Sequence, residues 1–258
     1  MTVLLSIRGL RVEFAARGSG RRQPVTAIGN LDLDVAAGET LAVVGESGAG
    51  KTTLAEAIVG LVRPSGGSIT FDGTEFAELR GRARRDLLVR MQMVAQNPLL
   101  ALSPRQTVGA QIEEPLRVHT SLSRARCRER ANEMIATLDL SPSVRRRLPH
   151  ELSGGQAQRA VLARALVLEP SMVIFDEPTS ALDVSVQAGV LNLLRELKAH
   201  HGLTYLFITH DLGVARHLAG RIAVMRAGEI VEQQPAGSLF TNPQHAYTRS
   251  LLASCLTV

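Results

Sequence analysis

The chain has 258 residues, of which 45% are hydrophobic and 3% aromatic, and its formal net charge is +5. This length and composition predict a globular chain with a sizeable core, either one large domain or a core with a subdomain. The only two cysteines, Cys127 and Cys255, are too few and too far apart in sequence for a disulfide framework or a zinc site, which indicates a reduced, cytosolic protein.

Two features of the sequence bear on membranes and nucleic acids. The N-terminus lacks the basic and apolar regions of a signal peptide, and no apolar run approaches the roughly 18–20 residues of a membrane span, so we expect any membrane role to depend on a partner. The positive charge is consistent with a nucleic-acid partner. It is also consistent with an arginine-rich face that is either solvated or directed toward anionic lipid. Because aromatic residues are few and Trp is absent, bases have no stacking platform, and we expect no nucleic-acid partner.

The first third of the chain predicts strands before and after the glycine-rich loop at 45–50. Alternation of apolar and polar residues favours half-buried strands, and a short continuous apolar run favours a fully buried one. On these grounds we predict strands over 3–14, 27–35, 41–44 and 68–71, a hairpin loop over 15–24 and a helix over 54–61.

The rest of the chain returns to strands after a long helical stretch. A strand over 90–95 is followed by helical spacing over 107–140, so we predict a helical subdomain over 97–152, inserted into a core of residues 1–96 and 153–234, with a tail over 235–258. Alternating strands and helices predict an α/β fold with a mainly parallel sheet, beside an N-terminal antiparallel β subdomain. Further strands are predicted over 172–175, 204–209, 222–225 and 229–231, helices over 157–168, 186–200 and 212–219, and two short helical stretches in the tail.

A phosphate-binding motif lies between the predicted strand at 41–44 and the helix after it. The pattern G-x-x-x-x-G-K-[ST] is formed by Gly45, Glu46, Ser47, Gly48, Ala49, Gly50, Lys51 and Thr52, and Thr53 follows it. Glycines let backbone N–H groups converge on an anion, and the helix N-terminus adds its positive dipole end. Lys51 suits the β- and γ-phosphates of a nucleoside triphosphate, and the hydroxyl of Thr52 suits Mg²⁺.

Two later motifs suit the same chemistry. Leu152-Ser-Gly-Gly-Gln156 precedes a predicted helix, where serine and glycine favour an anion-binding end, although a simple glycine-rich cap is the alternative. The apolar residues Met172 to Phe175 are followed by Asp176 and Glu177, which places two acids at the carboxyl end of a buried strand. Asp176 suits Mg²⁺ through water, and Glu177 suits the role of general base toward an attacking water.

The order of these motifs resembles the ATPase subunit of an ABC transporter over nearly the whole chain. The resemblance implies a P-loop RecA-like core and assigns each motif a name: Walker A at 45–52, the Q-loop glutamine Gln96, the signature LSGGQ at 152–156, Walker B at 172–176 with Glu177, the D-loop at 180–183, which ends at Asp183, and the switch histidine His210.

A mechanism follows from the resemblance. Two ATPase subunits close head to tail on two ATP molecules, so that Ser153, Gly154, Gly155 and Gln156 of one subunit meet the ATP held by the other. Gln96 senses Mg²⁺ and the attacking water, and His210 contacts the γ-phosphate and positions Glu177 and the water. Family members stack the adenine on an aromatic residue upstream of Walker A, and Phe14 is the nearby candidate, with a core phenylalanine at a strand end as the alternative.

Two stretches resemble the peptide and nickel importers within this family. These are Gln96-Asn-Pro98 with Leu102 to Val108, and Phe240 to Leu252 with its Asn-Pro-Gln-His-Ala-Tyr-Thr run. The resemblance implies membrane-spanning permease subunits, a second, related ATPase subunit with a homodimer as the alternative, a periplasmic or extracellular substrate-binding protein, and a peripheral place on the cytoplasmic face of the inner membrane. A peptide, nickel and a metal–chelator complex remain open as cargo, and the alternatives are an exporter subunit or a non-transport ABC ATPase.

Overall fold

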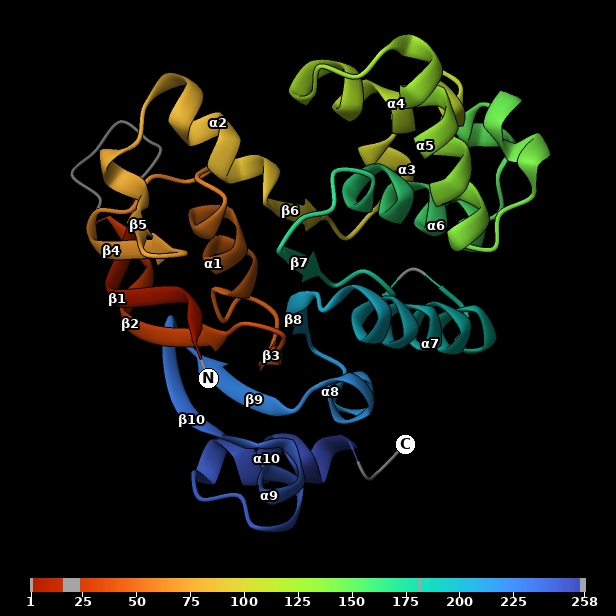
Figure 1. Cartoon of the computed structure of the whole chain (residues 1–258). Helices are drawn as coiled ribbons and strands as arrows, with labels where there is room; N and C mark the ends of the chain where they lie inside the picture. Colours follow the sequence, from red (N-terminus) through yellow and green to blue (C-terminus); the bar gives the residue numbers. More distant parts are fainter. Residues whose placement is uncertain (1, 16–23, 181, 256–258) are drawn as a thin grey trace. The chain divides into compact units, whose positions relative to one another are not determined.

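The structure is a computed structural model that describes residues 2–15, 24–180 and 182–255 (Figure 1). The chain divides into two compact units, which we describe separately: residues 1–84 with 204–258, and residues 85–203. The first boundary passes through helix α2 (Gly81–Val89). No helix was predicted for this basic stretch, because α2 is rich in arginine and buries only one side chain, Leu87.

The first unit contains an antiparallel sheet in the strand order β2-β1-β4-β5. The long strands β1 and β2 pair from Val3 beside Ala36 to Phe14 beside Val25. Strand β1 has the predicted bounds, whereas β2 extends beyond the predicted range of 27–35 at both ends. The predicted loop over 15–24 joins them, but its residues 16–23 lie outside the described residues. The strands are β1 (Val3–Phe14), β2 (Val25–Ala36), β4 (Gly66–Phe71) and β5 (Thr74–Glu75), followed by a 3-10 turn at Phe76–Glu78.

The same unit contains parallel strands beside a C-terminal hairpin, in the order β10-β9-β3-β8. Strands β3 and β8 are buried along their whole length, as expected for parallel strands with both faces covered. The predicted hairpin at Ala227-Gly228 is confirmed, and both turn residues have positive φ, 47° and 83°, as a tight hairpin turn requires. The strands are β3 (Thr40–Val44), β8 (Thr204–Thr209), β9 (Arg221–Arg226) and β10 (Glu229–Pro235).

Four helices complete the first unit: α1 (Lys51–Ile58), α8 (Leu212–Leu218), α9 (Ala236–Thr241) and α10 (Ala246–Cys255). The tail of the chain is confirmed as two short helices, α9 and α10, which lie together beside β9 and β10 (Figure 1). Its side chains Leu239 and Tyr247 join one apolar cluster with Val44 of β3 and Val224 of β9. The tail is therefore part of the core around the strand that leads into the glycine loop.

The described residues of the second unit form two parallel strands and five helices, in addition to the C-terminal half of α2. Strands β6 (Met91–Val94) and β7 (Met172–Asp176) pair in parallel, with Val94 beside Phe175. The helical stretch predicted over 107–140 consists of two helices, because the chain leaves the first at Thr120 and Ser123 caps the second. The helices are α3 (Pro98–Ala101), α4 (Val108–His119), α5 (Arg124–Thr137), α6 (Gly154–Leu166) and α7 (Val184–His201), with 3-10 turns at Pro142–Arg146 and Pro149–Glu151.

Helices α4, α5 and α6 pack against one another within this unit (Figure 1). The boundaries 97–152 of the helical subdomain stay a prediction of the sequence, since the compact unit includes β6, β7 and α7 as well. None of the helices among the described residues is long and apolar enough to cross a membrane.

Candidate functional site

The glycine loop between β3 and α1 has the geometry of a phosphate-binding loop. The helix begins at Lys51, so the sequence-based start at residue 54 was wrong by almost one turn. Gly50 permits this early start, because its φ of 102° turns the chain directly into the helix, and Leu54 N–H donates the first helical bond to the Gly50 carbonyl at 2.9 Å. The glycine loop therefore leads directly into a helix N-terminus, which is where backbone N–H groups bind anions in known phosphate sites.

Two glycines of the loop are also required by crowding. A Cβ on Gly45 would lie 2.2 Å from the carbonyl oxygen of Met225, and a Cβ on Gly50 would lie 2.6 Å from that of Ala27. Both neighbours are backbone atoms and cannot move aside as a flexible side chain can. The loop thus lies between the β9–β10 hairpin and β2, and neither Gly45 nor Gly50 has space for a side chain.

Lys51 is the cation of this loop. Its side chain is only 5% exposed, and its Nζ donates to the carbonyl oxygens of Gly45 and Glu46, each at 2.8 Å. The ammonium is thereby folded back over the loop that carries the phosphate-binding N–H groups. A buried, charged donor within the loop is the feature that the lysine of a phosphate-binding motif provides.

The predicted switch histidine, His210, directly follows the neighbouring strand of the same unit, β8. Strands β3 and β8 run parallel, with Val44 beside Thr209, so the glycine loop and His210 follow adjacent strand ends. The carboxyl ends of parallel strands are where open α/β sheets bind ligands. His210 is exposed there, and Asp211, the next residue, caps α8 through the N–H groups of Gly213 and Val214.

In the second unit, the predicted general base and the Q-loop glutamine are in contact. They follow the paired strands β7 and β6, and Gln96 Nε2 donates to Glu177 Oε2 at 3.0 Å. Glu177 has a φ of 48°, a left-handed conformation that costs a non-glycine residue on the order of 1 kcal/mol. Asp176, the last residue of β7, is 5% exposed. The strand end therefore holds the buried carboxylate of Asp176 and the carboxylate of Glu177. The backbone of Glu177 is strained, and its side chain is oriented by the amide of Gln96.

The LSGGQ segment caps helix α6, which begins at Gly154 rather than at residue 157. Ser153 Oγ accepts from the Gln156 N–H at 3.3 Å, and Gln156 Oε1 accepts from the Ser153 N–H at 3.2 Å, which is a capping box. A Cβ on Gly155 would lie 2.6 Å from Val186 Cγ1 of α7. Serine, glycine and glutamine thus have structural roles in this chain in addition to any contact with a partner's nucleotide.

The D-loop aspartate also caps a helix. Asp183 accepts from the Val186 N–H at 2.9 Å and from the Ser185 hydroxyl at 2.7 Å, and these two hydrogen bonds lower the pKa of its carboxyl group. The carboxylate therefore stays ionised at the start of α7. Ala181, within the D-loop, lies outside the described residues.

The candidate adenine contact, Phe14, is the last residue of β1 and pairs with Val25. Its side chain is 43% exposed, which makes it one of the exposed large hydrophobic residues of the first unit. A core phenylalanine would be buried, so the exposure of Phe14 argues against the alternative that it is a core residue at a strand end. An exposed ring at a strand end can stack on a base.

The residues predicted to hold Mg²⁺ have suitable chemistry. Thr52 in the first unit offers a hydroxyl, while Asp176 and Gln96 in the second offer a carboxylate and an amide oxygen, all hard oxygen ligands. No group of three or more His, Cys, Asp or Glu side chains in the described parts of the chain is arranged to hold a metal.

Sequence reasoning missed one contact to the glycine loop. Tyr247 Oη accepts a hydrogen bond from the Glu46 N–H at 3.1 Å, across 201 residues of chain. The sequence singled out the segment around Tyr247 only as a subfamily motif. The available signal was a single tyrosine in a tail that mixes polar and apolar residues, and such a pattern does not indicate which residue the tyrosine contacts.

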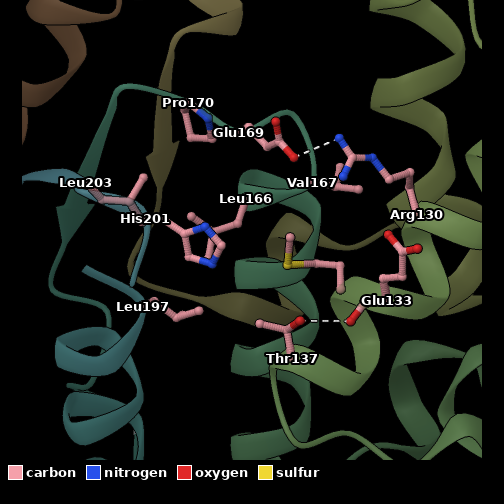
Figure 2. A pocket seen from close by; sticks show the side chains of 11 residues that line it. Arg130, Glu133, Thr137, Leu166, Val167, Glu169, Pro170, Leu197, His201 and Leu203 are labelled. Carbon is pink, nitrogen blue, oxygen red and sulfur yellow. Dashed lines mark hydrogen bonds and ion pairs between the residues drawn. The ribbon is translucent and has the colours of Figure 1, made fainter. Parts of the chain in front are cut away.

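A separate cavity of about 380 Å³ lies in the second unit, lined by residues of α5, α6, α7 and the loop before β7. Figure 2 shows the ion pair between Arg130 and Glu169, 2.7 Å apart, among its lining side chains. None of the motif residues lines it. It therefore does not belong to the nucleotide chemistry.

A buried strand, a glycine loop and a helix that starts at Lys51 define the P-loop nucleotide-binding class. Within that class, residues 28–180 match the family model of the ABC transporter, and the chain belongs to this family. It is 45% identical over 257 residues to the di/tripeptide transport ATP-binding protein DppF of Pseudomonas aeruginosa, covering 98% of this chain and 79% of that protein. It is 44% identical over 258 residues to the oligopeptide transport ATP-binding protein OppF of Escherichia coli, covering 98% and 77%.

Solved structures agree with the family. The dimeric structure of a post-hydrolysis state of the ATP-binding cassette MJ0796, bound to ADP and Pi, is 28% identical, with a TM-score of 0.81 over 90% of this chain and 99% of that one. The structure of cbiO1 from Clostridium perfringens, part of the transporter complex cbiONQ, is 25% identical, with a TM-score of 0.81 over 94% and 92%. The α/β fold with an antiparallel β subdomain is thus confirmed, and the chain is an ABC ATPase.

Proposed function

We propose that this chain is the ATP-hydrolysing subunit of an importer that takes up peptides. The observation that carries the proposal is its identity of 44–45%, over 98% of the chain, to ATP-binding proteins named for oligopeptide and di/tripeptide transport. A putative peptide import ATP-binding protein of Brucella ovis, 43% identical over 253 residues, favours an importer over the exporter and non-transport ATPases left open by the sequence. The names of these relatives also favour a peptide over nickel or a metal–chelator complex as cargo.

The glycine loop holds the triphosphate in this proposal. The N–H groups at the start of α1 donate to phosphate oxygens, and Lys51 leaves the carbonyl oxygens of Gly45 and Glu46 to reach the β- and γ-phosphates. Thr52, Asp176 and Gln96 are the residues that would hold Mg²⁺, which when bound neutralises the charge that develops on the phosphates. Phe14 stacks on the adenine through its exposed ring.

Hydrolysis needs a water aligned with the γ-phosphate and a group that takes its proton. Glu177 is that general base, and Gln96 orients it through the 3.0 Å hydrogen bond between their side chains. The left-handed backbone of Glu177 supports this assignment, since strain of this kind is concentrated at functional positions. His210, at the end of β8, contacts the γ-phosphate and helps to position the water.

The LSGGQ segment serves the ATP of a second subunit. The helix N-terminus that Ser153 and Gln156 cap is an anion-binding end, and Gly155 keeps the backbone there bare of a side chain. Asp183 of the D-loop completes this surface from the start of α7. The second subunit is a related ATPase, in a heterodimer rather than a homodimer.

The remaining partners follow from the relatives' function as importers. They are membrane-spanning permease subunits and a periplasmic or extracellular substrate-binding protein, with this chain bound peripherally to the cytoplasmic face of the inner membrane. The chain itself never touches the peptide, so the cargo is decided by those partners.

The catalytic part of the proposal is tested with Glu177→Gln. We expect ATP binding to persist in the assembled transporter and steady-state hydrolysis to fall by roughly 10²–10⁴-fold, because the variant lacks the base that accepts the water's proton. Glu196→Gln, at an exposed glutamate of α7 outside every motif, is the matched control and should keep wild-type turnover. Wild-type turnover in Glu177→Gln would refute the role of this residue.

The cargo is tested in cells that lack this chain. We expect uptake of a radiolabelled tripeptide to be lost, to return with the wild-type chain and to stay absent with Glu177→Gln. Uptake of ⁶³Ni²⁺ is measured in parallel in the same cells. If tripeptide uptake is unchanged by the deletion while nickel uptake is lost, the peptide assignment is wrong.

A further inference from the structure

We propose that Tyr247 in the C-terminal tail is a positioning residue for the phosphate-binding loop, so that the tail sets the nucleotide affinity of the subunit. The inference rests on the proposed function of that loop. The observation that supports the inference is the hydrogen bond from the Glu46 N–H to Tyr247 Oη at 3.1 Å. Both residues belong to the first unit.

The tail is held in place by a buried carboxylate. Glu232 of β10 is 8% exposed, and it accepts from the Gln244 N–H at 2.7 Å and from the His245 N–H at 2.9 Å. These two N–H groups belong to the chain just before α10, which begins at Ala246. Glu232 thereby fixes the entry to the helix whose second residue is Tyr247.

The ring of Tyr247 is fixed separately from its hydroxyl. It is 8% exposed in the apolar cluster that contains Val44, the strand residue just before the glycine loop. The guanidinium of Arg226, at the end of β9, lies 4.9 Å from the ring centroid, within the range of a cation–π contact. With the ring held by packing and by Arg226, the hydroxyl has one direction in which to point.

The hydroxyl acts on the peptide that also holds Lys51. The Glu46 N–H donates to Tyr247 Oη, and the Gly45 carbonyl of the same peptide group accepts from Lys51 Nζ at 2.8 Å. The Glu46 carbonyl, in the next peptide group, accepts from Lys51 Nζ at 2.8 Å and from the Ala49 N–H at 3.2 Å. On the other side of the loop, the Gly228 N–H donates to the Ala49 carbonyl at 2.9 Å. The loop backbone from Glu46 to Ala49 is thus held by hydrogen bonds before nucleotide binds, so less backbone freedom remains to be lost on binding.

Packing alone does not explain a tyrosine at this position. The apolar cluster and the Arg226 contact need only an aromatic ring, which phenylalanine also provides. The hydroxyl adds one specific bond, and that bond goes to the phosphate loop. Tyr247→Phe therefore separates the two roles, because it keeps the ring and removes the bond.

The experiment measures ADP and ATP affinity of the full chain by calorimetry at a temperature well below unfolding. For Tyr247→Phe we expect binding about 2- to 10-fold weaker, the range for one hydrogen bond. Tyr205→Phe is the matched control, because Tyr205 lies beside Thr40, at the end of β3 away from the loop, and should leave affinity unchanged. A purely structural tyrosine would lower the unfolding temperature without changing affinity.

A second measurement leaves Tyr247 in place. The chain has two tyrosines and no tryptophan, so labelling with 3-fluorotyrosine gives two ¹⁹F signals, which Tyr205→Phe assigns. We expect ADP to shift the signal of Tyr247. An affinity for Tyr247→Phe equal to wild type, or a Tyr247 signal that ADP does not move, overturns the inference.

The role of the buried carboxylate gives a third readout. Glu232→Gln should weaken nucleotide binding through loss of the tail's anchor, and adding Tyr247→Phe to it should cause little further loss, since both act through one contact. Fully additive losses would contradict this. The proposed function fails in a different way, namely if the wild-type chain itself binds no nucleotide.

Discussion

Substituting the second glycine of the signature segment tests how the site is packed. In Gly155→Ala the new Cβ would lie 2.6 Å from Val186 Cγ1, whereas an ordinary van der Waals contact is 3.4 Å or more. In Gly154→Ala, one residue earlier in the same helix turn, the nearest atom is Leu182 Cδ2 at 3.5 Å, so there is space for the methyl group. The two variants share their chemistry and differ in crowding.

The magnitudes follow from two opposing effects. Replacing glycine by alanine within a helix stabilises by up to about 1 kcal/mol, and both variants share this gain. Overpacking costs typically 1–3 kcal/mol, and only Gly155→Ala incurs it. We therefore expect Gly155→Ala to be less stable than Gly154→Ala by about 1–3 kcal/mol, or roughly 2–12 °C in unfolding temperature for a chain of this size.

The assay is thermal and urea unfolding of the two variants and the wild type under identical conditions. Adding Val186→Ala to Gly155→Ala removes the atom that is too close, and the double variant should regain most of the difference. Equal stability of Gly154→Ala and Gly155→Ala would refute the packing argument. The requirement for glycine at 155 would then arise from the partner's nucleotide alone.

Two further predictions concern the signature serine and the tail. Ser153→Arg should block ATP-driven closure with the second subunit, because it places a bulky side chain toward the partner's γ-phosphate, while nucleotide affinity of this chain stays nearly unchanged; size exclusion and calorimetry measure the two separately. Ser123→Arg, which removes an equivalent cap from α5, should leave closure intact. Burial raises the pKa of Glu232, but hydrogen bonds from Thr248, Gln244 and His245 lower it by more than burial raises it. The pKa of Glu232 therefore lies below its ordinary value. Its contribution to stability is present at neutral pH and is lost as the pH falls through that lowered pKa, so the stability difference between wild type and Glu232→Gln should shrink below about pH 4. A difference that is constant down to pH 3 would contradict this.

Local pattern was enough to predict most elements, and it failed where a tertiary contact sets an element's end. The buried strand at 41–44 and the acids after 172–175 are visible because burial requires an apolar run and the chemistry follows directly in sequence. The start of α1 was wrong because Gly50, held against the Ala27 carbonyl, turns the chain into the helix at Lys51. Helix α2 was missed because it is rich in arginine and buries a single leucine, so its sequence is that of a solvated basic segment.

The sequence by itself determined the family and the set of motifs, because a phosphate loop needs its glycines and lysine at fixed spacing within a few residues. It could not determine which distant residues meet. The bond from Gln96 to Glu177 depends on β6 pairing with β7, and the place of His210 depends on β8 pairing with β3. The contact between Glu46 and Tyr247 spans 201 residues and exists only because the tail packs against β3 and β9. Strand pairing and burial are properties of the whole fold, so these contacts were decided by the tertiary structure alone.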